Sequence, residues 1–220
     1  MLTLFGNLDS GNVHKVQMIL KYRGLPFRRV DVRQDRGQPR DPRFRDVNKI
    51  GKVPAVRFSD GTVLSESGAL LFYFSSQTPL WPGGIRAQAE VLRWMFFEQY
   101  SHEPALAVLR YLQRFVPDPD LHRERIADLE AKSKFVLGVL EQRLAESDWI
   151  AGPTTTIADF ALYPYTRWME EVGFARRDWP AIDRWLVRFE RTPEFLPLYA
   201  DGASEVLEFS DYFRLASHGD

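Results

Sequence analysis

The spacing of apolar residues changes once along this chain, and that change restricts the possible folds more than any other feature. In residues 1–77 strand-like and helix-like patterns alternate, and they predict elements in the order β-α-β-α-β-β-α. Beyond a segment rich in proline and glycine, the spacing is helical throughout and predicts no strand. A βαβ unit followed by a hairpin and a helix is typical of an α/β layered fold. We therefore expect an α/β domain followed by an all-helical domain.

The segment TPLWPGG separates the two patterns. Proline and glycine interrupt helical and strand patterns alike, so such a segment predicts a linker. We therefore divide the chain into a domain at 1–77, a linker at 78–86 and a helical domain at 87–220.

The helical part contains four amphipathic stretches. We expect a bend in the first of them at Pro104, because proline lacks the amide hydrogen that continues a helix. The predicted helices cover 85–115, 121–144, 157–172 and 181–190, and a short piece follows Pro193.

The composition excludes several classes of protein. The 220 residues include no cysteine, which rules out a disulfide scaffold, a cysteine zinc site and catalysis by a protein thiolate. The net charge of −1 argues against a general nucleic-acid binder, and no apolar run approaches the roughly 18 residues of a membrane-spanning helix. Histidines and carboxylates lack metal-ligand spacing, so no metal site is predicted. We expect a cytoplasmic protein without nucleic-acid or membrane partners.

Ser10, Gly11 and Asn12 stand where the first predicted helix begins. The free amide groups of a helix N-terminus carry a partial positive charge, which stabilises an anion such as a thiolate. A serine hydroxyl that donates a hydrogen bond to a thiolate stabilises only the charged form, and so lowers the pKa of the thiol. The alternative is that Ser10 or Asn12 only caps the helix, a role that suits both residue types.

Two further pairs are candidate binding residues. Pro54 opens a predicted strand; if its bond to Val53 is cis, the backbone of Val53 turns outward to pair with an extended peptide, whereas a trans proline only marks a strand edge. Ser67 begins the third predicted helix, whose free amide groups suit a carboxylate, while Glu66 suits an ammonium group. The alternative for Ser67 is again a helix cap.

These motifs, in this order, resemble the thioredoxin-like N-terminal domain of the glutathione transferases. In the helical half, the segment Thr156-Ile157-Ala158-Asp159-Phe160 is similar to the capping box in the core helix of that superfamily. The first turn has no tyrosine and the chain has no cysteine, so the resemblance is to bacterial serine-type members, which are theta-, nu- or phi-like.

The resemblance implies a role for each candidate residue. Ser10 would activate the sulfur of glutathione, and Asn12 would assist or replace it. The residues implied to hold the rest of glutathione are Lys52 at the glycine carboxylate, Val53 with a cis Pro54 at the cysteinyl unit, and Glu66 with Ser67 at the γ-glutamyl group.

The implied activity is that of a detoxifying glutathione transferase, with glutathione as co-substrate and no metal. Bound glutathione, ionised at the first helix, would attack a small electrophile. The presence of Asn12 leaves a glutathione-dependent disulfide reductase as an alternative function. Because the same fold is reused as a scaffold, a non-catalytic interaction module is a second alternative. We expect the second substrate between the domains. The side chains expected to line its pocket are Phe97, Tyr100, Ser101, Tyr165 and Trp168.

Local charge and apolar surface lead to two further expectations. From Arg28 to Lys52 there are nine basic and four acidic residues, a net of +5 that would attract anionic glutathione, although a solvated face is an equal alternative. The resemblance also implies a homodimer. The apolar side chains expected to exceed what one core can hold are Leu71, Phe74, Leu92 and Met95.

Overall fold

The computed structural model describes residues 1–193 and 195–216, which group into two compact units. The first consists of Met1–Phe74 together with the described part of 194–220, and the second is Ser75–Pro193. This grouping differs from the expected division in the last residues, which join the α/β unit rather than the helical one.

The first unit is built on a five-stranded sheet with the order β4-β3-β1-β2-β5. β1 runs parallel to β2, and β2 runs parallel to β5; β3 is antiparallel to both β1 and β4. The four strands expected from the sequence are confirmed, but the expectation that no strand follows the linker is wrong. The strands are β1 (Leu2–Phe5), β2 (Phe27–Asp31), β3 (Ala55–Arg57), β4 (Val63–Ser65) and β5 (Glu205–Glu208).

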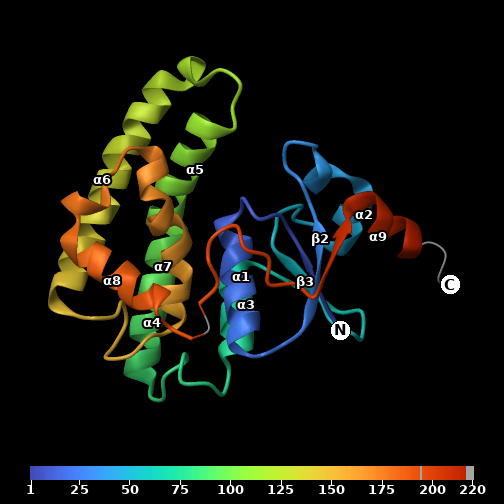
Figure 1. Cartoon of the computed structure of the whole chain (residues 1–220), viewed down its shortest axis with the longest axis horizontal. Helices are drawn as coiled ribbons and strands as arrows, with labels where there is room; N and C mark the ends of the chain where they lie inside the picture. Colours follow the sequence, from blue (N-terminus) through green and yellow to red (C-terminus); the bar gives the residue numbers. More distant parts are fainter. Residues whose placement is uncertain (194, 217–220) are drawn as a thin grey trace. The chain divides into compact units, whose positions relative to one another are not determined.

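Helices cover both faces of this sheet. Figure 1 shows α2 and α9 on one side of it and α1 and α3 on the other. The order β-α-β-α-β-β-α of the thioredoxin-like part is confirmed, and α9 is an addition that the sequence did not predict. The helices of this unit are α1 (Gly11–Tyr22), α2 (Pro42–Val47), which follows a 3-10 turn at Gln38–Arg40, α3 (Ser67–Ser75) and α9 (Phe209–Ala216).

The second unit is helical in its described residues and is centred on α7. Every residue from Ile157 to Thr166 in this helix is buried. The helices of the unit are α4 (Ile85–Phe97), α5 (Glu103–Arg114), α6 (Arg123–Glu146), α7 (Ile157–Arg167) and α8 (Pro180–Glu190). Short 3-10 segments lie at Pro119–His122, Trp168–Val172 and Arg176–Asp178.

The first long helix of the second unit is interrupted close to the expected bend. A π-helical turn at Glu98–His102 separates α4 from α5, and Pro104 lies just after it. Proline has no amide hydrogen for the carbonyl of Tyr100, and its ring crowds that carbonyl, so the turn before it widens. The sequence therefore located the cause of the interruption, while the distortion itself lies one turn earlier.

The predicted capping box forms at the start of α7. The Thr156 hydroxyl accepts from the Ala158 amide at 3.3 Å, and the Asp159 carboxylate accepts from the Thr156 amide at 2.8 Å. Asp159 also accepts from the Ile150 amide and from the indole of Trp185. The box thus ties α7 to α8 and to the preceding loop, which is a structural role. Within the described ranges, no helix combines the length and the apolar character needed to cross a membrane.

Candidate active site

The register of the strands brings the candidate segments to one end of the sheet. Phe5 pairs with Ala55, and Ala55 pairs with Ser65. These residues are the last of β1, the first of β3 and the last of β4, so the segments directly beyond them lie next to one another. The candidate residues in those segments are Ser10 and Asn12 after β1, Lys52, Val53 and Pro54 before β3, and Glu66 and Ser67 after β4.

Ser10 is the N-cap residue of α1. Its Oγ accepts from the amide of Val13 at 3.3 Å, so the helix-cap alternative is realised. A hydroxyl that accepts one hydrogen bond still has its own hydrogen to donate. The side chain is half-buried, and the first turn of α1 contains no acidic residue to offset the positive end of the helix. Capping and stabilisation of a thiolate are therefore compatible roles for this hydroxyl.

The loop that presents Ser10 is held in a defined conformation. A Cβ added at Gly6 would lie 2.3 Å from the Cγ2 of Val13, so the close approach of β1 to α1 requires glycine. The side-chain amide of Asn7 donates to the carbonyl of Val32 at 2.8 Å, which joins the loop to the end of β2. The position of the Ser10 hydroxyl is consequently set by β-sheet contacts as well as by the helix.

Asn12 links the start of α1 to the start of α3. Its Oδ1 accepts from the Lys15 ammonium at 2.7 Å and from the Ser67 hydroxyl at 3.3 Å. Two candidate sites that are 55 residues apart in the sequence are thus in direct contact. Lys15 is buried, which its sequence position did not predict, because a lysine in an amphipathic helix normally marks a solvated face. Its ammonium group places a positive charge beside Asn12, which also contacts Ser67.

The loop before β3 contains the second candidate pair. The Val53–Pro54 peptide bond is cis, which agrees with the resemblance described above. Val53 and Pro54 are buried, whereas Lys52 is exposed and its ammonium group is accessible to an anion. The side-chain amide of Asn48 donates to the Lys52 carbonyl at 2.8 Å and closes the loop between α2 and β3.

Glu66 and Ser67 form the third candidate pair. Glu66 has a φ of 70°, in the left-handed region that residues other than glycine rarely occupy. Its carbonyl accepts from the amide of Leu70 at 2.9 Å, as expected of the residue before a helix. This conformation leaves the Glu66 carboxylate exposed while the Ser67 side chain is buried against Asn12. A strained residue at the edge of a candidate site supports a functional constraint there.

The basic residues from 28 to 52 are for the most part paired. Five of the nine have a carboxylate within 4.0 Å: Arg28, Arg29, Arg33, Arg36 and Arg43. Three of these pairings are with acidic residues of the same run, and Glu205, Glu208 and Asp201 of the last segment supply others. The unpaired positive charge of this run is therefore smaller than the net of +5 counted from the sequence. Lys52 is the basic residue of the run nearest to Val53 and Pro54.

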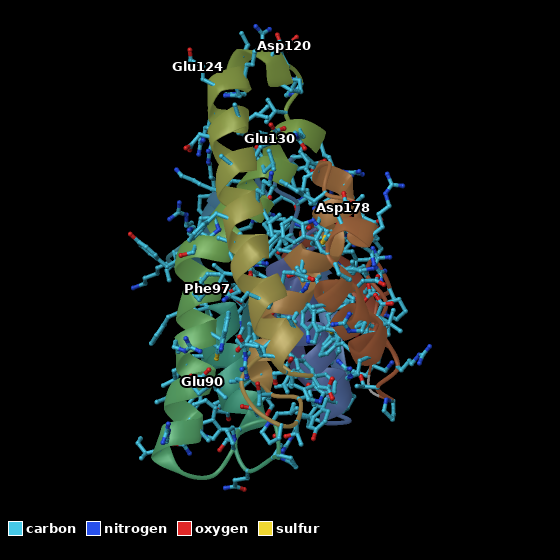
Figure 2. All side chains as sticks on the ribbon, turned by 90° about the vertical axis from the view of Figure 1, so that its left-hand side faces the viewer. Glu90, Phe97, Asp120, Glu124, Glu130 and Asp178 are labelled. Atoms are coloured by element: carbon cyan, nitrogen blue, oxygen red, sulfur yellow. The ribbon has the colours of Figure 1, made fainter. Side chains whose placement is uncertain are left out.

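The predicted pocket residues all belong to the helical unit and fall into two sets. Tyr165 and Trp168 are buried together, with ring centroids 5.7 Å apart. Phe97 lies near His102, and Figure 2 shows it on α4 further along the helix than Glu90. Tyr100 is 87% exposed, so the helical unit by itself does not enclose it. The same figure places Asp120 and Glu124 at the far end of the unit from Glu90.

Two features of the helical unit were not anticipated from the sequence. His102 is buried and its Nε2 is 2.9 Å from the Thr166 hydroxyl, which itself donates to the Leu162 carbonyl, so the imidazole is a core hydrogen-bond donor. Arg110 is buried with its guanidinium 3.9 Å from the centroid of the Trp168 ring and 2.7 Å from Glu171. Among the described residues, no group of three or more histidines, cysteines or acids could hold a metal ion.

Comparisons with known proteins agree with this arrangement in both units. The glutathione S-transferase N-terminal domain matches residues 9–77, and the glutathione S-transferase C-terminal domain matches residues 105–193. The chain belongs to the glutathione S-transferase superfamily. Its fold, a thioredoxin-like domain followed by a helical domain, is the fold of this superfamily.

Solved structures of bacterial glutathione S-transferases are similar along most of the chain. The enzyme from Xanthobacter autotrophicus Py2 is 39% identical with a TM-score of 0.87, covering 90% of this chain and 97% of that one. The enzyme from Pseudomonas fluorescens Pf-5 is 34% identical with a TM-score of 0.88, covering 90% of this chain and 99% of that one.

A second group of similar proteins carries a different name. Protein URE2 of Meyerozyma guilliermondii is 26% identical over 87% of this chain and 77% of its own length. Ure2p, solved in complex with glutathione, is 25% identical with a TM-score of 0.79, covering 88% of this chain and 95% of that one. The protein of this name in Saccharomyces cerevisiae is called a transcriptional regulator, so membership of the superfamily does not by itself distinguish an enzyme from a regulator.

Proposed function

We propose that this protein is a glutathione transferase that binds glutathione at the end of β1, β3 and β4 and ionises its thiol at the start of α1. The observation that carries the proposal is the direct contact of Asn12 with Ser67. This contact joins the N-terminus of α1 and the start of α3 into one site. Solved relatives that contain glutathione support the choice of ligand.

In the proposed reaction, the thiol of glutathione loses its proton to water, and Ser10 donates a hydrogen bond to the resulting thiolate. The sulfur then forms a bond to an electrophilic carbon, and the leaving group departs with the electron pair of the bond that breaks. Each unit by which the site lowers the thiol pKa corresponds to about 1.4 kcal/mol in favour of the thiolate. The protein supplies ionisation and position, and glutathione supplies the nucleophile.

The rest of the site accounts for the remainder of glutathione. The Glu66 carboxylate would accept from the γ-glutamyl ammonium group, and Ser67 with the first turn of α3 would hold the neighbouring carboxylate. The backbone of Val53 would pair with the cysteinyl unit, and the exposed Lys52 would meet the glycine carboxylate. The electrophile would contact side chains of the helical unit, for which Phe97, Tyr100, Ser101, Tyr165 and Trp168 remain our predictions.

Two other activities have a specific observation in their favour. Asn12, placed beside Ser67, favours a disulfide reductase, in which the thiolate attacks a disulfide sulfur and a second glutathione releases the mixed disulfide as glutathione disulfide. The likeness to URE2, which in Saccharomyces cerevisiae is named a transcriptional regulator, favours a non-catalytic module. In that case the fold would bind glutathione without turnover.

One experiment separates these three functions. The unmodified protein is first applied to immobilised glutathione and eluted with the free tripeptide. Its turnover is then measured with a panel of electrophiles, and separately with a mixed disulfide plus free glutathione. Conjugation would support the transferase, disulfide reduction alone would support the reductase, and retention without any turnover would support the module. A protein that is not retained would contradict the transferase, the reductase and a module that binds glutathione, and would favour a scaffold without a glutathione site.

We further propose that the protein forms a homodimer, although the side chains first expected to drive it are not all available. Leu71, Phe74 and Met95 are buried in the chain, so the expectation that they exceed what one core can hold is wrong. The exposed large apolar side chains on α3 and α4 are Phe72, Tyr73, Ile85, Leu92 and Phe96, of which Leu92 was among those expected. Sedimentation equilibrium at micromolar concentration should give roughly twice the chain mass of 25.6 kDa. A monomer would contradict the dimer.

A further inference from the structure

The segment that follows the helical unit returns to the α/β unit and lies outside both matched domains. We name residues 195–216 the C-terminal strap; the matches end at residue 77 and at residue 193. β5, within the strap, adds a parallel strand to the edge of β2, with Val30 opposite Leu207. α9 follows β5 directly. A terminal segment without a role in the unit would not need a strand and a helix of its own.

The first part of the strap is joined to β1 and α1. Arg29, which is buried, donates to the Asp201 carboxylate at 2.9 Å and to the Gly6 carbonyl at 2.8 Å. The backbone amide of Gly202 donates to the side chain of Gln17 in α1 at 2.9 Å. The strap is thus linked, through one arginine, to the carbonyl from which the Ser10 loop departs.

The second part of the strap packs on α2. The guanidinium of Arg43, in α2, lies 5.1 Å from the ring centroid of Phe209 and 5.6 Å from that of Phe213. These two rings are in turn 4.8 Å apart. Cation–π contacts with two packed rings hold the first turn of α2 against α9.

The same helix also contacts β3. The guanidinium of Arg57, at the end of β3, donates to the Tyr212 hydroxyl at 2.8 Å and lies 5.7 Å from the centroid of Phe5. Tyr212 packs edge-on against Phe5 of β1, with ring centroids 5.2 Å apart. Both aromatic side chains are buried. α9 therefore contacts Arg43 and Arg57, which bracket a stretch of 13 intervening residues.

The bracketed stretch contains the loop with Lys52, Val53 and Pro54. It has little regular structure beyond the short α2, and its own bonds are local: Asn48 donates to the Lys52 carbonyl, and Arg45 donates to the Lys49 carbonyl at 2.9 Å. Phe44 packs on Phe5 of β1, with ring centroids 6.0 Å apart, and Ala55 pairs with Phe5, so the stretch contacts the sheet near its two ends. The position of the loop between them depends on what holds those ends.

We propose that the C-terminal strap is a positioning element for the glutathione-binding loop, with Phe209, Tyr212 and Phe213 holding residues 43–57 in the conformation that binds the tripeptide. The proposal rests on the proposed function, since it concerns the same site. When only a fraction of molecules has the binding-competent loop, the apparent Kd rises by the inverse of that fraction. A loop that is competent a tenth of the time gives a Kd about tenfold weaker.

The test uses the full chain with Phe213→Ala, which removes one of the two rings under Arg43 and leaves β5 intact, and with the stronger Phe209→Ala/Phe213→Ala. The Kd for reduced glutathione is measured by titration calorimetry, and backbone hydrogen exchange of residues 41–57 by mass spectrometry. We expect the Kd to rise about tenfold for Phe213→Ala, with faster exchange confined to 41–57 and kcat at saturating glutathione changed less than about twofold.

Two controls separate positioning from a general loss of stability. Leu215→Ala alters an exposed residue of the same helix and should leave both the Kd and the exchange as in the unmodified protein. Thr156→Ala weakens the capping box of the other unit, and should lower the melting temperature without changing the Kd. A Kd for Phe213→Ala within twofold of the unmodified value, with unchanged exchange at 41–57, would overturn the proposal.

Failure of the proposed function has a different signature. If the unmodified protein does not bind glutathione, the proposed function is contradicted, and the exchange measurement alone decides whether the strap orders the loop. Faster exchange at 41–57 in Phe213→Ala would then support the ordering, and unchanged exchange would contradict it. If Phe209→Ala/Phe213→Ala fails to fold, Phe213→Ala alone gives the result.

Discussion

The N-termini of α1 and α7 use the same chemistry under opposite conditions. At α7, the cap and its reciprocal acid, Thr156 and Asp159, are buried, and the carboxylate accepts four hydrogen bonds from within the unit. At α1, the cap Ser10 is half-buried, and the first turn has no acidic residue to neutralise the positive end of the helix. A helix end with all its groups paired inside the protein stabilises the fold, whereas one that faces solvent with its positive charge unanswered can serve a ligand.

The largest effect is expected where the box of α7 is broken. Asp159→Ala removes the acceptor from Thr156, Ile150 and Trp185 in a fully buried place, and the unfolding free energy should fall by about 4 kcal/mol. Denaturant unfolding measures this, with Asp178→Ala, an exposed acid, as the matched control. The fraction of the Asp159→Ala variant that folds should have the specific activity of the unmodified protein. A stable but inactive Asp159→Ala protein would make the structural role of this residue wrong.

The next effect concerns His14, the buried histidine of α1. Burial lowers the pKa of His14 from its usual 6.5 to about 4, although a hydrogen bond with the backbone of Leu196 partly opposes this. The unfolded chain takes up the proton more readily, so the neutral histidine's contribution is complete above about pH 6.5 and is lost as the pH falls toward 4. The loss should amount to about 3 kcal/mol of unfolding free energy.

Unfolding curves over that pH range test this prediction. His14→Gln should have a shallower dependence of stability on pH than the unmodified protein. His122→Gln, in the 3-10 turn of the helical unit, should keep the original dependence. Equal slopes for His14→Gln and the unmodified chain would show that another group is responsible for the loss of stability in acid.

Replacement of Ser10 should have a smaller effect on the free energy of unfolding but a large effect on turnover. Ser10→Ala should cost at most about 1 kcal/mol of stability for the lost cap. It should also cost about 2 kcal/mol of thiolate stabilisation, which lowers turnover roughly 30-fold at neutral pH. The ultraviolet absorbance of bound thiolate against pH measures the second term, with Ser76→Ala as control. Activity within twofold of normal would move the role to Asn12 or to the helix end alone.

The smallest effect is expected at Asn12, which joins the α1 end to Ser67. Asn12→Ala removes one neutral and one charged hydrogen bond, and should weaken glutathione binding about fivefold, or about 1 kcal/mol. Gln34→Ala, at an exposed position of the same unit, should leave the Kd unchanged. A complete loss of turnover in Asn12→Ala with normal binding would instead identify Asn12 as the main thiol-activating residue.

The sequence predicted those parts of the fold and site that depend on neighbouring residues. Thr156 and Asp159 are three residues apart, so the box is readable as a motif, and the strands of the first unit alternate clearly. β5 was missed because Glu205–Glu208 lies at the sheet edge with mostly exposed side chains, which leaves no alternation. Lys15 was missed for a related reason: its burial is a property of the packed fold, which the local pattern of the helix does not reveal.

The position of β5 also has a consequence for the order in which the chain folds. The first four strands are complete by Ser65, but the strand that covers the edge of β2 begins only at Glu205. At about 5–20 residues per second, the intervening 139 residues take roughly 7 to 28 seconds to synthesise. For that time the nascent sheet has an uncovered edge in a crowded cell, where such edges pair with other chains. Charged side chains along β2, including Arg28 and Arg29, disfavour such pairing until β5 has been synthesised and covers the edge.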